Sequence, residues 1–171
     1  VDGNAYYLID IWNAQEKVID KIYTLVNKDV RKQEKLDKLI EEMEKENQIC
    51  YNEKQKEAIT KALENNILII TGGPGTGKTT IIKAITELYG KLNNLDYDGL
   101  VENLALLAPT GRASKRMSES TLLPSSTIHR FLKWNKDTNE FMVCETNKDR
   151  SKLIIIDEVS MIDISLFDSL L

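Results

Sequence analysis

The chain has 171 residues, 42% of them hydrophobic and 29% charged, so it is long enough to bury a core and has the composition of a globular domain. Its net charge of −4 argues against nucleic-acid binding through bulk charge, and any such binding needs a local basic surface. The sequence has no apolar run of membrane-spanning length and no signal-peptide pattern, so we expect no membrane partner. Cys50 and Cys144 have neither metal-ligand spacing nor a disulfide framework, which favours the reducing cytoplasm.

The N-terminal part of the sequence predicts three helices. Apolar residues recur at helical spacing over residues 5–26. A charge-dense stretch over 28–46 carries a thin apolar stripe, which we interpret as a solvated helix lying on the domain. A third helix is predicted over 52–64, with Asn52 as its N-cap and Gln55 three positions later in capping-box register.

The rest of the chain alternates between strand and helix patterns. We predict strands over 67–71, 103–108 and 153–156, and helices over 78–89 and 109–119. Such alternation is typical of a parallel sheet with right-handed crossover connections. A short hairpin is also expected, in which Phe131–Trp134 and Phe141–Val143 flank the turn Asn135–Asn139.

A phosphate-binding loop directly follows the first of these strand patterns. Residues 72–79 read Gly-Gly-Pro-Gly-Thr-Gly-Lys-Thr, a complete G-x-x-x-x-G-K-T motif in the strand-then-loop context that its mechanism requires. Its glycines let backbone N–H groups point inward, and the helix that begins near Lys78 adds its positive end. We expect Lys78 to reach the β- and γ-phosphates and the Thr79 hydroxyl to ligate Mg²⁺. The predicted nucleotide-binding residues here are Gly72, Gly73, Pro74, Gly75, Thr76, Gly77, Lys78, Thr79 and Thr80.

Two acidic residues follow the last predicted strand. The apolar run 153–156 fits a strand buried on both faces, and the carboxyl end of such a strand is where α/β sheets place ligands. Asp157 there can hold Mg²⁺ through water opposite Thr79, and Glu158 is the candidate base that orients the attacking water. A solvated strand end is the alternative, and the phosphate loop argues for hydrolysis instead.

Three further segments resemble one family. Residues 107–116 read Leu-Ala-Pro-Thr-Gly-Arg-Ala-Ser-Lys-Arg, residues 126–132 read Ser-Thr-Ile-His-Arg-Phe-Leu, and residues 157–163 read Asp-Glu-Val-Ser-Met-Ile-Asp. In this order they resemble the RecD-like DNA helicases of superfamily 1, the group that contains the exodeoxyribonuclease V alpha subunit. The phosphate loop is similar to motif I of that family. The three segments are similar to its motif Ia, the adjoining DNA-contact motif and motif II.

The resemblance implies an α/β fold, a RecA-like P-loop NTPase lobe with a parallel β-sheet flanked by helices. The lobe would occupy residues 48–171, and the helical segment 1–47 would be the end of a preceding N-terminal domain. The stretch Asn52–Ile59 resembles the upstream glutamine motif of the family, in which Gln55 would read the adenine edge. The capping-box position of Gln55 explains it equally well without any adenine.

The resemblance also implies a function. The full-length protein would be an ATP-driven translocase or helicase on single-stranded DNA, moving 5′ to 3′ and acting in recombination and repair, with ATP and Mg²⁺ as cofactors. Its partners would be a second RecA-like lobe of the same chain, which supplies arginines to the ATP site, and subunits of a nuclease and helicase complex. The sequence starts at Val1 and ends at Leu171 inside an apolar run, so we expect a segment of a longer protein that binds nucleotide without turnover.

Four residues are the DNA-contact candidates. Thr110 and the N–H of Gly111 suit a contact with the phosphate backbone. Arg112 adds a positive charge that Lys115 and Arg116 reinforce, although it also fits an ordinary surface charge. His129, the only histidine, suits a phosphate contact or base stacking, and packing against a neighbouring helix is the alternative.

Other classes of ATPase remain as alternatives. Pif1-like helicases and the helicase part of conjugative relaxases have similar motifs, and the Gly-Gly-Pro-Gly start of the loop favours the RecD-like group. A non-helicase P-loop ATPase switch is opposed by the segments around Thr110 and His129. A small-molecule kinase would need an arginine-rich lid, which the sequence lacks.

Overall fold

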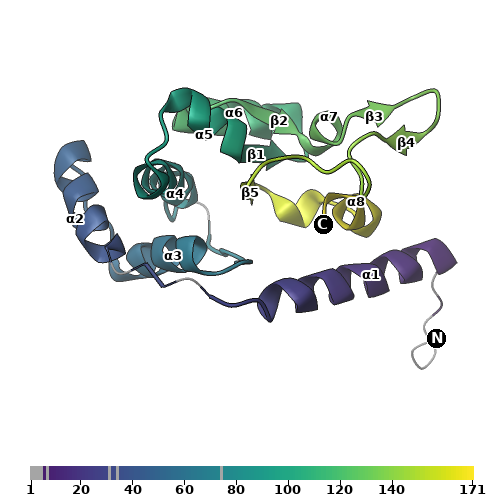
Figure 1. The fold of residues 1–171 in the computed structure, drawn as a ribbon, viewed down its shortest axis with the longest axis horizontal. Coiled ribbons are helices and arrows are strands. Elements are labelled where there is room, and N and C mark those ends of the chain that lie inside the picture. The colour runs from purple at the N-terminus through teal and green to yellow at the C-terminus, as the bar shows by residue number, and fades with distance from the viewer. Residues whose placement is uncertain (1–5, 7, 31, 34, 74) are drawn as a thin grey trace.

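A small parallel sheet with helices on both faces forms the centre of the molecule (Figure 1). The computed structural model describes residues 6, 8–30, 32–33, 35–73 and 75–171. The helices are α1 (Ile9–Val26), α2 (Leu36–Asn47), α3 (Glu53–Glu64), α4 (Lys78–Asn93), α5 (Tyr97–Asn103), α6 (Gly111–Thr121), α7 (Ile128–Phe131), the 3₁₀ helix η1 (Val159–Met161) and α8 (Ile164–Leu170). The strands are β1 (Leu104–Ala108), β2 (Ser125–Thr127), β3 (Trp134–Asn135), β4 (Glu140–Phe141) and β5 (Leu153–Ile156).

The main sheet has the strand order β2-β1-β5, and both of its pairings are parallel. Leu107 lies opposite Ile156 on one side of β1, and Ala108 lies opposite Thr127 on the other. Every residue of β1 is buried, as expected of a central strand with helices on both faces. The architecture is that of a RecA-like P-loop lobe, and it confirms the predicted fold class.

The two faces of β1 pack into different clusters. Leu104 and Leu106 face Ile82 of α4 and Met117 of α6. The alternate positions, Ala105 and Leu107, pack on the other face with buried residues that surround α7 and α8, namely Ile128, Leu132, Val143 and Leu166. This period-2 alternation is what holds α4 and α6 on one side of the sheet and α7 and α8 on the other.

The helix α2 is more deeply packed than its charge density suggests. It begins at Leu36, and Leu36, Ile40 and Met43 are almost completely buried. They share a core cluster with Ile59 of α3 and Leu88 of α4. The predicted apolar stripe is therefore the buried face of α2, and the helix is shorter than the predicted range 28–46. The division of the chain at residue 47 stays a prediction.

The first helix, α1, packs against the last helix, α8. In Figure 1, α1 (purple) runs beside α8 (yellow). Lys21 Nζ donates to both the carbonyl oxygen and Oδ1 of Asp168, at 2.8 Å each. Ala14 and Val18 are the buried residues of α1. None of the helices in the described ranges is both long and apolar enough to cross a membrane.

The predicted strand over 67–71 is absent, which corrects the sequence-based expectation. Ile69 is 74% exposed and Leu68 37% exposed. Within the described residues, 67–71 pair with neither edge strand of the sheet, β2 or β5, and without a ladder of hydrogen bonds an extended apolar run is no strand. The predicted strands over 103–108 and 153–156 and the predicted hairpin are confirmed, the last by pairing of Trp134 with Phe141. The expected burial of 153–156 on both faces is wrong, since β5 lies at the edge of the sheet and Ile154 is 40% exposed.

Candidate nucleotide and nucleic-acid site

Three of the predicted motifs lie at one edge of the sheet. Thr110 comes two residues after β1, His129 two residues after β2, and Asp157 directly after β5. Because the three strands are parallel and adjacent, their carboxyl ends meet at the same edge. Pairing of the sheet thus brings together segments that are separated by up to 47 residues in the sequence.

The phosphate loop is a compact turn that depends on two left-handed glycines. Gly75 has φ 73° and Gly77 has φ 85°, which L side chains rarely adopt. Lys78 Nζ donates to the carbonyl oxygens of Gly72 and Gly73 at 2.8 and 2.7 Å, so the lysine side chain folds back over the loop. The hydroxyl of Thr76 donates to the same Gly73 carbonyl at 2.8 Å. Pro74 lies outside the described residues.

The loop leads directly into the N-terminus of α4. Gly77 is the N-cap of this helix, and within the described residues no side chain caps it. The backbone N–H groups of Lys78, Thr79 and Thr80 occupy the first turn, where a helix has no intrahelical acceptor for them. Such free donors at the positive end of a helix dipole suit an anionic ligand. The hydroxyl-bearing Thr79 is exposed in this first turn.

Gln55 connects α3 to this loop. Its Oε1 accepts from the backbone N–H of Asn52 at 3.0 Å, and Asn52 Oδ1 accepts from the N–H of Gln55 at 2.9 Å. This is the predicted capping box. In addition, Gln55 Nε2 donates to the carbonyl oxygen of Thr76 at 3.2 Å. Sequence reasoning missed this second contact, because nothing in the local pattern shows that α3 and the loop meet.

The two acids after β5 differ in environment. The N–H of Asp157 donates to the carbonyl of Leu107 at 2.9 Å, and Asp157 is half-buried. Glu158 is exposed, has φ 53°, and donates its N–H to Asp157 Oδ1 at 2.9 Å. Within the described part of the chain, no hydrogen bond or ion pair joins these acids to the phosphate loop. The link is through packing, since Ile81 of α4 shares a core cluster with Leu153 and Ile155 of β5.

The donor set near this edge fits magnesium. Thr79 and Asp157 supply a hydroxyl and a carboxylate oxygen, and Mg²⁺ is usually held by one or two protein oxygens together with phosphate oxygens and water. No group of three or more His, Cys, Asp or Glu side chains in the described residues is arranged to hold a metal ion. A cation here would therefore depend on the nucleotide for most of its ligands.

The DNA-contact candidates differ in how free their side chains are. Thr110 Oγ1 accepts from the N–H of Ala113 at 3.2 Å and so caps α6. Gly111 has no atom within 4 Å of where a Cβ would lie, which leaves its backbone open to a ligand. Arg112 is exposed, whereas Lys115 lies 3.9 Å from the carboxylate of Glu119. The cap therefore holds Gly111 and Arg112 at the exposed start of a helix.

His129 lies beside the hairpin. Its ring centroid is 6.0 Å from that of Phe141, which packs edge-on against Trp134 at 4.7 Å. Trp134 is 38% exposed and His129 is exposed. Sequence reasoning missed the two aromatic residues as neighbours of His129, although both flank the predicted hairpin turn. Exposed rings at one place are the kind of surface on which nucleic-acid bases stack.

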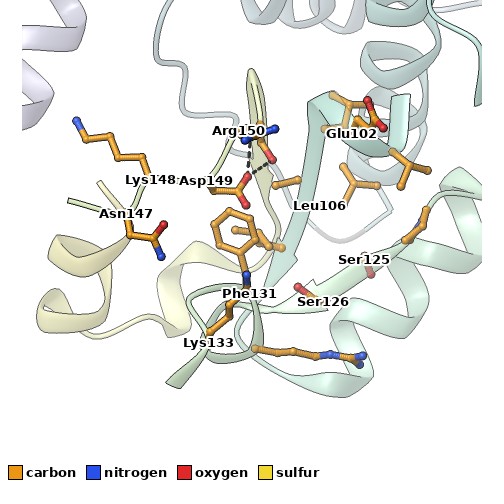
Figure 2. Close-up of a pocket in the computed structure, with 17 residues that line it drawn as sticks. Glu102, Leu106, Ser125, Ser126, Phe131, Lys133, Asn147, Lys148, Asp149 and Arg150 are labelled. Atoms are coloured by element: carbon orange, nitrogen blue, oxygen red, sulfur yellow. Dashed lines mark hydrogen bonds between the residues drawn. The ribbon is translucent and has the colours of Figure 1, made fainter. Parts of the chain in front are cut away.

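A separate cleft of about 610 Å³ lies beside β1 and β2. Its lining includes Glu102 before β1, Phe131 and Lys133 after β2, and Asp149 and Arg150 before β5 (Figure 2). Asp149 Oδ1 accepts from both the N–H and the hydroxyl of Ser151, at 2.8 and 2.5 Å. Burial by itself would raise the pKa of Asp149, but these hydrogen bonds outweigh it and lower the pKa. None of the predicted site residues lines this cleft.

The fold and the site together define a class. A phosphate loop before a helix, a parallel sheet, and an acidic pair at its carboxyl edge are the parts of a P-loop nucleotide-binding lobe. The family described as "AAA domain" matches residues 55–171.

The chain is also similar to curated helicase proteins. It is 30% identical over 182 residues to the RecBCD enzyme subunit RecD of Buchnera aphidicola subsp. Acyrthosiphon pisum, covering 96% of this chain and 29% of that protein. It is 36% identical over 120 residues to the ATP-dependent RecD2 DNA helicase of Deinococcus radiodurans, covering 70% of this chain and 15% of the relative. A third relative is the RecBCD enzyme subunit RecD of Mycolicibacterium smegmatis, 32% identical over 136 residues, with 70% of this chain and 24% of the relative covered.

The chain belongs to the AAA domain family, and within it to the RecD-like helicases of superfamily 1. This confirms the family inferred from the phosphate loop and from the segments around Thr110, His129 and Asp157. The chain spans less than a third of the length of these relatives, at 29% for the first.

Proposed function

We propose that this chain is the ATP-binding lobe of an ATP-dependent DNA helicase or translocase that acts on single-stranded DNA in recombination and repair. The observation that carries the proposal is the meeting of three motif segments at the carboxyl edge of one parallel sheet, with the phosphate-loop helix α4 packed on that sheet. A 5′ to 3′ direction is part of the proposal and comes from the family resemblance.

In this proposal the phosphate loop binds the nucleotide. Lys78 exchanges its contacts with the loop carbonyls for contacts with the β- and γ-phosphates, because an ammonium group bonds more strongly to a phosphate anion than to a neutral carbonyl. Thr79 and Asp157 would hold Mg²⁺, which would neutralise charge on the phosphates. Glu158, exposed just beyond Asp157, orients and deprotonates the attacking water.

The proposed DNA surface is the same carboxyl edge of the sheet. The backbone of Gly111 and the side chain of Arg112 would contact phosphates, with Thr110 holding the start of α6 in place. His129 would stack on a base or contact a phosphate, supported by its neighbour Phe141. All four residues follow strands that end at the same edge of the sheet as the acidic pair, so DNA bound there would lie near the proposed ATP site.

The remaining parts of the proposed machine lie outside this lobe. A second RecA-like lobe would supply the arginines that stabilise charge on the transferred phosphoryl group, an effect worth roughly 10³–10⁵ in rate. Subunits of a nuclease and helicase complex are proposed partners, since two of the relatives are named as RecBCD subunits. A cytoplasmic location is proposed from the two free cysteines, Cys50 and Cys144.

Phosphate release measured with and without single-stranded DNA tests the proposal. The full-length protein is expected to hydrolyse ATP faster when DNA is present, while residues 1–171 alone bind ATP with negligible turnover and no response to DNA. If single-stranded DNA does not change the rate of ATP hydrolysis by the full-length protein, the result would instead favour an ATPase switch that binds protein partners. DNA-stimulated turnover by residues 1–171 alone would show that one lobe holds a complete catalytic site.

A further inference from the structure

We infer that Gln55 is a positioning residue for the phosphate loop, which acts through the carbonyl of Thr76. The inference rests on the proposed function of the loop in phosphate binding and deepens it. It differs from the adenine contact that the family resemblance implies for Gln55, because the partner is the protein backbone.

The orientation of the Gln55 amide is set by the capping box. Its Oε1 accepts from the N–H of Asn52 at 3.0 Å, while Asn52 Oδ1 accepts from the N–H of Gln55 at 2.9 Å. With the amide oxygen held toward the cap, the amide nitrogen points away from it and donates to Thr76 O at 3.2 Å. The N-terminus of α3 thus presents a donor in one orientation to the loop.

The orientation of the Thr76 carbonyl also fixes the orientation of the next backbone N–H in the loop. The C=O of Thr76 and the N–H of Gly77 belong to one planar peptide unit, in which they point in opposite directions. A bond that holds the carbonyl toward α3 therefore directs the Gly77 N–H away from α3. That N–H belongs to the G-x-x-x-x-G-K-T motif, whose inward-pointing N–H groups bind phosphate.

The loop has few other restraints. Gly75 and Gly77 are free to rotate because they lack side chains. The bonds from Lys78 and from the Thr76 hydroxyl run within the loop itself, and the lysine bonds compete with phosphate for the same ammonium group. Among the hydrogen bonds of the described residues, the one from Gln55 reaches the loop from another element and does not compete with phosphate.

The Gln55 amide also lies close to Gly77. A Cβ at position 77 would lie 2.6 Å from Gln55 Nε2, closer than real Cβ contacts allow. The φ of 85° at this position requires glycine, and any larger residue would also displace the glutamine amide from the place it occupies.

Tripolyphosphate has no base, so its binding tests positioning of the phosphate loop separately from recognition of adenine. Binding of Mg²⁺-tripolyphosphate and of Mg²⁺-ATP is measured by calorimetry for the unaltered protein and for Gln55→Met, which keeps the side-chain length and removes both amide contacts. We expect Gln55→Met to weaken tripolyphosphate binding about fivefold, as for one lost hydrogen bond, and ATP binding by at least that factor. Asn52→Ala is the matched control, since it removes one bond of the capping box and leaves the amide facing Thr76.

Both variants are expected to lower the melting temperature to a similar extent, while Asn52→Ala leaves tripolyphosphate binding within twofold of the unaltered value, roughly the spread of weak contacts. If Gln55→Met does not fold, Gln55→Ala, which removes both amide contacts without adding a charge and has high helix propensity, takes its place. Loss of ATP affinity with unchanged tripolyphosphate affinity would overturn the inference and favour adenine reading. Unchanged affinity for both ligands would also overturn it. An unaltered protein that binds no tripolyphosphate would refute the phosphate site itself, and the inference with it.

Discussion

Asp157 and Leu107 are joined by a backbone hydrogen bond, in which the N–H of Asp157 donates to the carbonyl of Leu107 over 2.9 Å. The bond continues the pairing of β5 with β1 one residue beyond the end of β5. Sheet pairing therefore holds the backbone of Asp157, and the left-handed φ of 53° at Glu158 turns the chain immediately afterwards. The result is a half-buried carboxylate next to an exposed one, an arrangement that lets two neighbouring acids have different roles.

Replacing Lys78 with alanine is expected to weaken ATP binding by roughly 10- to 100-fold, because a charge-assisted contact with the phosphates is lost. Calorimetric titration of the purified protein measures the change. Lys83→Ala on the same helix is the control, since Lys83 lies 3.7 Å from the carboxylate of Glu87 and outside the loop. Equal ATP affinity in Lys78→Ala and unaltered protein would contradict the assignment of the loop.

Glu158→Gln in the full-length protein is expected to retain ATP binding and to lose hydrolysis by about 10²-fold or more. The amide keeps the shape of the side chain and removes the carboxylate that accepts a proton from water, while Asp157 still serves the metal. Single-turnover phosphate release and nucleotide affinity are measured on the same preparation. Turnover at the unaltered rate would mean that another residue is the base.

Arg112→Ala in the full-length protein is expected to weaken single-stranded DNA binding equally for all sequences and to reduce the salt slope by about one counterion. The physical reason is that a phosphate contact carries charge and no base information. Fluorescence anisotropy over a series of salt concentrations gives both quantities. Lys91→Ala on α4, which removes an ion pair with Glu46 of α2, controls for the loss of any positive charge. An unchanged slope in Arg112→Ala removes this residue from the site.

The contact between α2 and the start of α3 is expected to make stability depend on pH. Glu44 accepts from Lys56 Nζ at 3.0 Å and from the N–H of Tyr51 at 2.7 Å. The hydrogen bond from Lys56, followed by that from Tyr51, holds the pKa of Glu44 below its ordinary value. A carboxyl whose pKa is lower in the folded state stabilises the fold above its unfolded-state pKa, and this contribution is lost as the pH falls through the folded-state pKa.

Melting temperatures of the unaltered protein and of Glu44→Gln, measured across the acidic range, test this linkage. The variant is expected to melt lower near neutral pH, and the difference should shrink as the pH falls. Glu57→Gln is the control, because Glu57 pairs with Lys61 at 2.6 Å on an exposed helix surface, where such pairs contribute little. A gap between Glu44→Gln and unaltered protein that stays constant with pH would show that packing, and not charge, connects α2 to α3.

Much of the site could be predicted from the sequence because its signals are local. The phosphate loop is a contiguous motif, and the capping box of Asn52 and Gln55 spans four neighbouring positions. The strands β1 and β5 are continuous apolar runs, and β1 is buried on both faces as such a run predicts, whereas β5 lies at the edge of the sheet and is only partly buried. Each of these features depends on residues within one turn of helix or one strand, so composition and spacing are enough to find it.

The features that sequence reasoning missed are contacts between distant segments. The bond from Gln55 to Thr76 joins residues 21 positions apart, and His129 meets Phe141 only because the hairpin folds back over α7. The apolar run 67–71 had the pattern of a strand, yet pairing requires a neighbouring strand, which no local pattern reveals.

The sequence by itself determined the class of this protein, because phosphate binding depends on backbone turns and a lysine that one short motif specifies. The helix α2 shows what tertiary structure decided. Its charged sequence indicates a solvated surface, and its stripe of Leu36, Ile40 and Met43 became core through contact with α3 and α4. Burial depends on what packs against a residue, so the three-dimensional arrangement settled which apolar residues are interior and which acids, such as Asp157, are partly shielded from water.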